Sequence, residues 1–244
     1  MVSNRIIRVS YSLLLNELTK ENWMNKETFI AVDNYYEDLF QVKGSDFERI
    51  NEAADKAGLP AIQVSPLQGK FLQLMVLAQG SKRVLEIGTL GGYSTAWLAS
   101  GLPENGLLIS LELDPLHAEI AQKNLAHFDF RGEVEIRIGD AQQLIDELIL
   151  SKAEPFDLIF IDADKEGYAD YLNRVVKISR PGTLIIADNV VRNGRIIEEN
   201  SQDSSVLGIQ RFNQALISNS HLTASTLQTV GARSYDGFTF IVVK

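Results

Sequence analysis

Short apolar runs alternate with longer amphipathic segments through most of the chain, and this alternation predicts an α/β fold. After Gly80 each run is rich in β-branched or other apolar residues and precedes a segment long enough for a crossover helix. The runs predicted as strands of one parallel sheet are 83–87, 107–113, 134–138, 158–161 and 184–187. Strands and helices that alternate in this way are typical of a doubly wound sheet.

The C-terminal segment has a different pattern, because two apolar runs follow each other without a helix between them. Residues 222–230 and 238–243 are separated by a short stretch rich in turn-forming residues. Within that stretch, Asp236 and Gly237 form a dipeptide typical of tight hairpin turns. The pattern predicts a hairpin that adds an antiparallel strand to the otherwise parallel sheet.

Three segments before the first strand are predicted as helices that lead into the sheet. Residues 29–40 have apolar positions at helical spacing. Ser45 and Glu48 have the spacing of a capping box at a helix start. Ser65 precedes a proline at the first helical position, and the apolar stripe that follows ends at Gly80.

Length and composition predict one domain with a small-molecule ligand. The 244 residues are 45% hydrophobic, which suffices for one core. We assign residues 29–244 to this domain and residues 1–28 to an N-terminal arm, whose first two dozen residues are either mobile or ahead of the true start. The net charge of −9 disfavours nucleic acid. The sequence shows neither a membrane span nor a secretory signal, so a cytoplasmic location is expected.

A glycine-rich turn after the first strand predicts a nucleotide-like cofactor at the carboxyl edge of the sheet. Gly88 begins the turn, but the G-x-G-x-x-G pattern of dinucleotide sites is missing. Glu86 beside the turn would repel phosphates and suits the cationic groups of S-adenosylmethionine. Glu112 ends the next strand, where a carboxylate can bind ribose hydroxyls. The alternatives are a turn used only for packing and a solvated Glu86.

Acidic and amide side chains follow two later strands and predict a metal site. Asp162 follows one strand, and Asp188 and Asn189 follow the next. The chain has no cysteine and three histidines, so oxygen ligands are expected, which suit Mg²⁺, Mn²⁺ or Ca²⁺. Three protein donors leave positions for two substrate oxygens. The alternative is that each aspartate caps the helix that follows it.

Lys165 is the predicted general base of this site. A divalent cation and partial burial would both favour its neutral amine. The alternative is a surface lysine paired with Asp164. The polar stretch 192–205 follows a strand end and is predicted as a loop that can cover the site.

These motifs resemble the cation-dependent class I O-methyltransferases, a family that includes caffeoyl-CoA and catechol O-methyltransferases. The resemblance extends from about residue 29 to the C-terminus and is carried by residues 85–94 (LEIGTLGGYS), 160–165 (FIDADK) and 187–189 (ADN). It implies a Rossmann-like fold with a seven-stranded, mostly parallel sheet, and a homodimer. The basic N-terminal segment with which plant members bind coenzyme A has no counterpart here.

The resemblance also implies a role for each matching residue. The predicted cofactor contacts are Val64, Glu86, Gly88, Thr89, Ser94, Glu112, Ala141 and Asp164. The predicted metal ligands are Asp162, Asp188 and Asn189. Lys165 and Asp162 are the predicted catalytic residues, and Asn193 is predicted to face the substrate.

The sequence therefore predicts metal-dependent methyl transfer from S-adenosylmethionine to one hydroxyl of a vicinal diol. A phenylpropanoid, flavonoid or related phenolic is the expected acceptor. Two alternatives come from other classes, a nicotinamide-dependent oxidoreductase and a non-catalytic cofactor-binding module.

Overall fold

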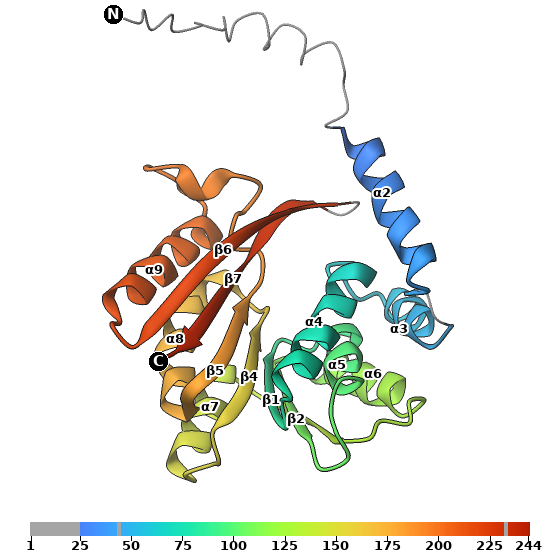
Figure 1. Ribbon diagram of the computed structural model, residues 1–244, viewed down its shortest axis with the longest axis horizontal. Coiled ribbons are helices and arrows are strands. Elements are labelled where there is room, and N and C mark those ends of the chain that lie inside the picture. Colours follow the sequence, from blue (N-terminus) through green and yellow to red (C-terminus); the bar gives the residue numbers. More distant parts are fainter. Residues whose placement is uncertain (1–24, 43–44, 232–233) are drawn as a thin grey trace, which may run out of the picture.

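The computed structural model describes residues 25–42, 45–231 and 234–244, and Figure 1 shows a central sheet between two layers of helices. The strands are β1 (Arg83–Ile87), β2 (Leu107–Glu112), β3 (Glu133–Ile138), β4 (Phe156–Ile161), β5 (Ser179–Ala187), β6 (Leu222–Val230) and β7 (Tyr235–Val243). The α-helices are α2 (Lys26–Leu39), α3 (Ser45–Lys56), α4 (Pro66–Gln79), α5 (Tyr93–Ala99), α6 (Pro115–Leu125), α7 (Ala141–Leu150), α8 (Tyr168–Val175) and α9 (Ser204–Ser218). Three 3₁₀ turns are η1 (Lys165–Gly167), η2 (Val176–Ile178) and η3 (Arg195–Ile197).

The sheet confirms the predicted doubly wound topology. In the described residues it has seven strands in the order β3-β2-β1-β4-β5-β7-β6. The first five of these strands are parallel, whereas β7 pairs antiparallel with both β5 and β6. The strand order reverses between β1 and β4, and in open α/β sheets the ligand crevice lies at such a switch point.

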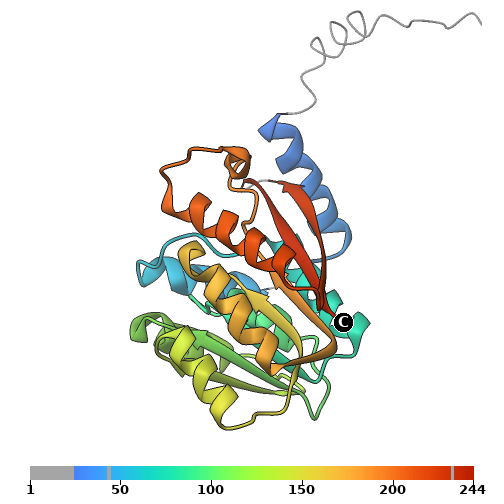
Figure 2. The same ribbon diagram turned by 90° about the vertical axis from the view of Figure 1, so that its left-hand side faces the viewer.

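Alternate side chains of the strands pack against the two helical layers (Figures 1 and 2). Ile159 and Ile185 face the layer of α7, α8 and α9. Phe160 and Ile186, their neighbours along the same strands, face the layer of α4, α5 and α6. By the same alternation, the first residue after a strand end is directed towards one helical layer and the next residue towards the other.

Helix α4 begins and ends as its sequence predicts. Ser65 and Gln68 form a reciprocal capping box, in which the Gln68 amide oxygen accepts from the Ser65 backbone N–H at 2.8 Å. Pro66 occupies the first helical position, and Gly80 ends the helix in the left-handed conformation. The cap of Ser45 at α3 lies outside the described side chains.

The prediction that Asp236 and Gly237 form the hairpin turn is wrong. Both residues lie inside β7, where they pair with Thr229 and Gln228 of β6. The Asp236 carboxylate is buried and accepts hydrogen bonds from backbone N–H groups. These bonds take the place of the hydrogen bonds to water that an exposed aspartate in a turn would make. A Cβ at Gly237 would lie 2.5 Å from the Leu227 carbonyl oxygen, so only glycine fits this close approach.

Other predicted boundaries shift by a few residues. Strand β4 begins two residues earlier than predicted, and β5 begins at Ser179 rather than at residue 184. The predicted helix 29–40 is α2. Residues 1–24 of the predicted arm lie outside the described residues. Among the described helices, none has both the length and the apolar character that a bilayer crossing requires.

Candidate functional site

The carboxyl ends of three parallel strands bring the two halves of the predicted site together. The backbone N–H of Asp162, just after β4, donates to the carbonyl of Ile87 at the end of β1 (2.9 Å). The backbone N–H of Asp188, just after β5, donates in the same way to Ile161 (3.0 Å). The glycine-rich turn and the predicted metal ligands are therefore neighbours at one edge of the sheet.

The glycine-rich turn is fixed by contacts from both neighbouring strands. Gly88 has a φ of +100°, and a Cβ there would lie 2.1 Å from the backbone oxygen of Asp162. The Glu112 carboxylate accepts from the backbone N–H groups of Thr89 (3.0 Å) and Leu90 (2.8 Å). Glu112 thus supports the turn itself, and its predicted ribose contact stays a prediction.

Glu86 is a fully buried carboxylate beneath this turn. Its Oε2 accepts from the hydroxyls of Thr95 (2.5 Å) and Ser110 (2.6 Å). Burial raises the pKa of Glu86 from 4.5 to about 7, although the hydroxyls of Ser110, Ser94 and Thr95 oppose this rise. Within the described part of the chain, Glu86 Oε1 is buried without a hydrogen-bond partner. Because a buried acceptor without a donor is costly, this oxygen suits a ligand's donor or cation.

We expect cofactor affinity to fall as the pH drops below about 7. Protonation of Glu86 removes the negative charge that would face a ligand ammonium, so affinity should fall by up to about tenfold per pH unit. Calorimetric titration of S-adenosylmethionine on both sides of this pH measures the effect. Glu86→Gln should bind weakly with a flat profile, and an equally flat profile in the wild-type protein would contradict this role.

The raised pKa of Glu86 also makes the free energy of unfolding depend on pH. Because folding raises the pKa of Glu86, its contribution to stability is present below 4.5 and is lost as the pH rises through about 7. Glu86→Gln removes this loss, so the ligand-free variant should gain stability relative to the wild-type protein at alkaline pH.

Three more of the predicted cofactor contacts lie in α5, in α7 and just before α4. Ser94 is buried in the first turn of α5, and Val64 is buried in the core beside α4. Ala141 begins α7, whose N-terminus is capped by the Asp140 carboxylate through the Gln143 N–H at 3.0 Å. Their contacts with a cofactor stay predictions.

Asp162 and Asp188 form an acidic pair at the ends of β4 and β5. Asp188 is 2% exposed, and its Oδ1 accepts from the backbone N–H of Asn189 at 2.6 Å. Burial and the neighbouring Asp162 charge raise the pKa of Asp188 well above its ordinary value, and Lys165 only partly opposes them. Among the described residues, no three His, Cys, Asp or Glu side chains cluster as a metal site. The predicted set contains only two acids, with the Asn189 amide as third donor.

Lys165 is buried and fully engaged as a donor. Its Nζ donates to Asp162 Oδ1, the Ala163 carbonyl and the Tyr168 hydroxyl, each at 2.9 Å. Burial favours the neutral amine, but Asp162 and Tyr168 outweigh it and raise the pKa of Lys165 above its ordinary value. The predicted neutral base depends on a divalent cation beside Lys165, so it stays a prediction. The alternative pairing with Asp164 is not found in the structure.

Asp164 caps the 3₁₀ turn η1 that follows it. Its Oδ2 accepts from the Gly167 backbone N–H at 2.9 Å, and its Oδ1 accepts from the Tyr171 hydroxyl. Burial and the bond to Asp164 raise the pKa of Tyr171, so this hydroxyl stays a donor. The predicted cofactor contact of Asp164 stays a prediction.

The segment after Asn189 is held in place by Asp236 of β7. Asp236 Oδ1 accepts from the backbone N–H groups of Val191 (2.9 Å), Arg192 (3.0 Å) and Gly237 (3.0 Å). Arg192 and Asn193 both have a φ of +55°, so the chain turns sharply here. Asn193 is exposed, as a substrate-facing residue should be. Its contact with substrate stays a prediction, as does the covering role of residues 192–205, which contain η3.

We expect Asp236→Ala to lower the free energy of unfolding by about 2 kcal/mol or more, because three backbone donors lose their acceptor. It should also weaken Mn²⁺ binding, since the anchored segment begins next to Asn189. Denaturant unfolding and electron paramagnetic resonance measure the two effects. Asp236→Asn keeps an acceptor oxygen and should lose less of both. Equal stability of the Ala variant and the wild-type protein would contradict the anchoring role.

Three contacting residues were not singled out from the sequence. Tyr168 is fully buried, and its hydroxyl donates to the backbone oxygens of Ile161 and Asp188 (both 3.0 Å). Its spacing of three from Lys165 on a helical segment was an available signal. Ser110 was the only polar residue between apolar ones in its strand, and Thr95 reaches Glu86 from the first turns of α5.

Comparison with known proteins identifies relatives over most of the chain. The family model described as O-methyltransferase matches residues 43–241. A catechol O-methyltransferase from Niastella koreensis is 47% identical over 221 residues, which are 91% of this chain and 100% of that protein. A catechol O-methyltransferase from Mycobacterium tuberculosis is 43% identical over 192 residues, which are 79% of this chain and 86% of that protein.

Solved structures show the same fold. The O-methyltransferase from Bacillus cereus, in complex with SAH, has a TM-score of 0.88 and 47% identity, covering 90% of this chain and 100% of that one. TomG from Streptomyces achromogenes, an O-methyltransferase in complex with SAM, has a TM-score of 0.84 and 36% identity, covering 91% and 99%. These likenesses remove the oxidoreductase alternative and confirm the resemblance found in the motifs. The chain belongs to the class I O-methyltransferase family.

Proposed function

We propose that this O-methyltransferase transfers the methyl group of S-adenosylmethionine to one hydroxyl of a catechol-like phenolic, with a divalent cation bound beside it. One observation carries the proposal. A buried Glu86 with an unpartnered oxygen and the acidic pair Asp162 and Asp188 lie at the same edge of the sheet. The first suits a cationic cofactor, and the second suits a cation.

The donor pocket fits S-adenosylmethionine better than a phosphate-bearing cofactor. Glu86 Oε1 can accept from the ammonium of the methionine portion, whereas it would repel a pyrophosphate. The known structures of the Bacillus cereus and Streptomyces achromogenes proteins in complex with SAH and SAM support the same donor.

The acidic pair fits a hard divalent cation. Burial and the neighbouring Asp162 charge raise the pKa of Asp188, and a bound cation would offset both effects. Asp162, Asp188 and Asn189 would hold the ion, and oxygen donors of this kind suit Mg²⁺ most and Mn²⁺ or Ca²⁺ next. When bound, the ion would neutralise the two carboxylates and stabilise the phenolate form of the acceptor.

The chain's own residues position the two reactants and take the proton. The methyl group passes from sulfur to the acceptor oxygen in one step, so a C–O bond forms as the C–S bond breaks and the hydroxyl proton leaves. The turn at Gly88 and the segment at Asn193 hold donor and acceptor in near-attack geometry. With a cation held at Asp162, Lys165 would be held less strongly as an ammonium, and after it had released its own proton to solvent its neutral amine would accept the hydroxyl proton.

A homodimer and a cytoplasmic location complete the proposal. The dimer rests on the family resemblance, and the location stays an expectation from the sequence. The net charge of −9 disfavours a polyanionic partner and so favours a small acceptor molecule, whereas its phenolic nature rests on the family resemblance.

A methylation assay across vicinal diols and matched monophenols tests the proposal. With Mg²⁺ present, catechols should be methylated and monophenols should not. Thorough chelation, or Asp162→Ala, should abolish turnover. Turnover that survives both would contradict the cation's role. Tight cofactor binding without turnover on any catechol would instead favour a non-catalytic binding module.

A further inference from the structure

A group of buried hydroxyls surrounds one oxygen of the Glu86 carboxylate. Ser110 of β2 is the direct partner of Glu86 in the β1–β2 register, and its hydroxyl donates to Glu86 Oε2 at 2.6 Å. Thr95 of α5 donates to the same oxygen at 2.5 Å. The hydroxyl oxygen of Thr89, in the glycine-rich turn, lies 2.5 Å from that of Ser110. Oε2 therefore has two donors, whereas Oε1 has none among the described residues.

The hydroxyl hydrogens of this group have one arrangement while Glu86 is ionised. A hydroxyl has a single hydrogen to donate. Ser110 donates its hydrogen to Glu86, so Thr89 must be the donor in the contact between Thr89 and Ser110. The hydrogen bonds therefore run from the turn through Ser110 to Oε2. They leave Oε1 as the oxygen that can accept from a ligand.

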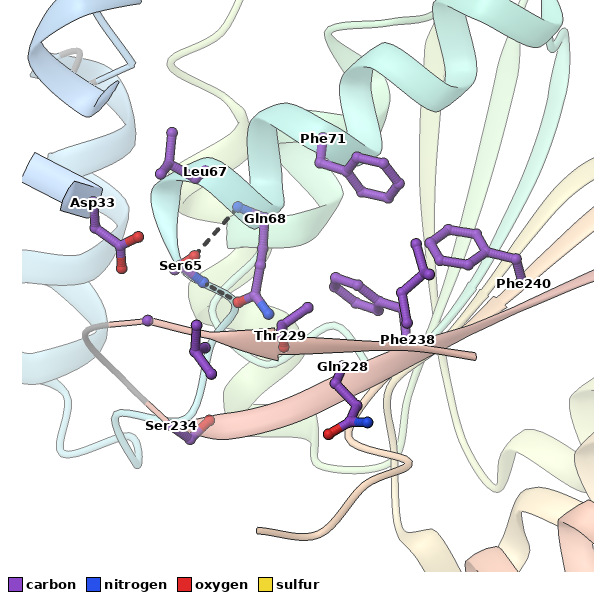
Figure 3. A pocket seen from close by; sticks show the side chains of 13 residues that line it. Asp33, Ser65, Leu67, Gln68, Phe71, Gln228, Thr229, Ser234, Phe238 and Phe240 are labelled. Carbon is purple, nitrogen blue, oxygen red and sulfur yellow. Dashed lines mark hydrogen bonds between the residues drawn. The ribbon is translucent and has the colours of Figure 1, made fainter. Parts of the chain in front are cut away.

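Water cannot take the place of these hydroxyls. Thr89, Thr95 and Ser110 are 2%, 0% and 0% exposed. Other hydroxyls of the chain are placed differently: Thr229 and Ser234 line an open groove of about 360 Å³ between α4 and the β6–β7 hairpin (Figure 3), which is large enough for water. A buried carboxylate that loses a donor has no such substitute, and hydrogen bonds to a charged group are the stronger ones.

The other surroundings of Glu86 oppose its ionisation. Burial and the charge of Asp162, just beyond the end of β4, both raise its pKa. Phe160, its partner on β4, is apolar. The Glu112 carboxylate of β2 is bound to backbone N–H groups of the turn. The groups that favour the charged form are thus the hydroxyls.

We propose that Ser110 and Thr95 are positioning residues of the cofactor site, which keep Glu86 ionised near neutral pH and leave its Oε1 to accept from the ammonium of the cofactor. The proposal rests on the proposed function, because it takes the cofactor to be the cation S-adenosylmethionine. Ser94 also lowers the pKa of Glu86, but it is itself a predicted cofactor contact. Ser110 and Thr95 would act through Glu86 alone.

The pair Thr95→Val and Thr95→Ser tests the proposal through cofactor affinity. Valine keeps the shape of the side chain and removes the donor, whereas serine keeps the donor and removes a methyl group. The Kd of S-adenosylmethionine is measured by calorimetry on the full chain between about pH 5 and about pH 8. In Thr95→Val the pH below which affinity falls should move up by about one unit or more, which weakens binding about tenfold at acid pH.

Two further variants complete this series. Thr95→Ser should keep the wild-type pH midpoint, and Ser110→Ala, which removes the other donor, should move the midpoint in the same direction as Thr95→Val. Titration of the cofactor's own amine is common to all variants, so differences between them report Glu86.

Unfolding of the ligand-free protein gives a second readout that needs no cofactor. A higher pKa of folded Glu86 extends the loss of stability to higher pH, so the cost of Thr95→Val should grow with pH. Its effect on the unfolding equilibrium constant should be about tenfold larger at about pH 9 than at about pH 5. Thr183→Val is the matched control, because Thr183 is 1% exposed and donates to the neutral carbonyl of Phe156 at 2.6 Å. Its cost should be equal at both pH values.

The outcomes separate this role from the proposed function. A wild-type midpoint of cofactor affinity in both Thr95→Val and Ser110→Ala would overturn the positioning role, and so would a cost of Thr95→Val that is equal at both pH values. A midpoint that moves equally in Thr95→Ser and Thr95→Val would assign the effect to packing and overturn it as well. Shifted midpoints in a protein that methylates no catechol would instead support the positioning role and contradict the proposed function.

Discussion

Asp188→Asn is expected to abolish methyl transfer while making the ligand-free protein more stable. The amide keeps the size of the side chain and an acceptor for the Asn189 N–H, but removes one charge of the acidic pair. If the pair holds the cation, the loss in kcat should be on the order of 10³-fold, equivalent to about 4 kcal/mol of transition-state stabilisation. Mn²⁺ binding measured by electron paramagnetic resonance should be lost, whereas the cofactor Kd should stay close to that of the wild-type protein.

The raised pKa of Asp188 explains why Asp188→Asn should stabilise the metal-free protein. Folding raises the pKa of Asp188, so the contribution of this group is present below its unfolded value and is lost as the pH rises through the folded one. Asparagine suffers no such loss, so denaturant unfolding of metal-free samples at neutral pH should show a gain of about 1 kcal/mol or more. Stability that falls in the variant would mean that Asp188 is a structural group rather than a ligand.

Asp164→Ala is the matched control, because it removes another carboxylate two residues from Asp162. It deletes the cap on Gly167 and the partner of Tyr171, so the free energy of unfolding should fall by about 1 to 2 kcal/mol. Mn²⁺ binding should remain. Loss of Mn²⁺ binding in both variants would show that the measurement reports general damage to this edge of the sheet.

The sheet and the convergence of the site could be predicted from sequence because both follow from the strand pattern. Parallel strands end at one edge, so Glu86, Asp162 and Asp188 had to meet once their strands were recognised. Right-handed crossovers are expected between such strands, whereas their order β2-β1-β4-β5 is seen only in the structure. The motifs and the strand pattern therefore predict the same position for the site, at the carboxyl edge of the sheet.

What the sequence did not reveal depends on cross-strand neighbours. Asp236 and Gly237 have the composition of a turn, yet β7 continues through them because Asp236 bonds to backbone donors 44 and 45 residues away. The buried link from Glu86 to Ser110 requires the β1–β2 register, in which the two residues are direct partners. The charge of Lys165 depends on which side chains lie next to its amine, and the spacing of residues along the sequence does not determine this.

Gly88→Ala is expected to disable both halves of the site at once. The new Cβ would lie 2.1 Å from the Asp162 carbonyl oxygen, on a backbone whose φ of +100° already disfavours a side chain. The end of β4 must therefore move away from β1, which displaces the predicted ligand Asp162 together with the cofactor turn. Strain and overpacking should lower the free energy of unfolding by about 2 to 5 kcal/mol. Cofactor affinity and Mn²⁺ affinity should fall together.

Gly182→Ala separates strain from the clash. Gly182 has a similar φ of +92°, but an added Cβ there meets no atom within 4 Å among the described residues. Its cost should be limited to about 1 to 2 kcal/mol of backbone strain, with both affinities retained. Unfolding curves and the two binding titrations on both variants decide the matter. If the two alanine variants proved equally stable and equally able to bind, the contact between Gly88 and Asp162 could not be what couples the cofactor turn to the acidic pair.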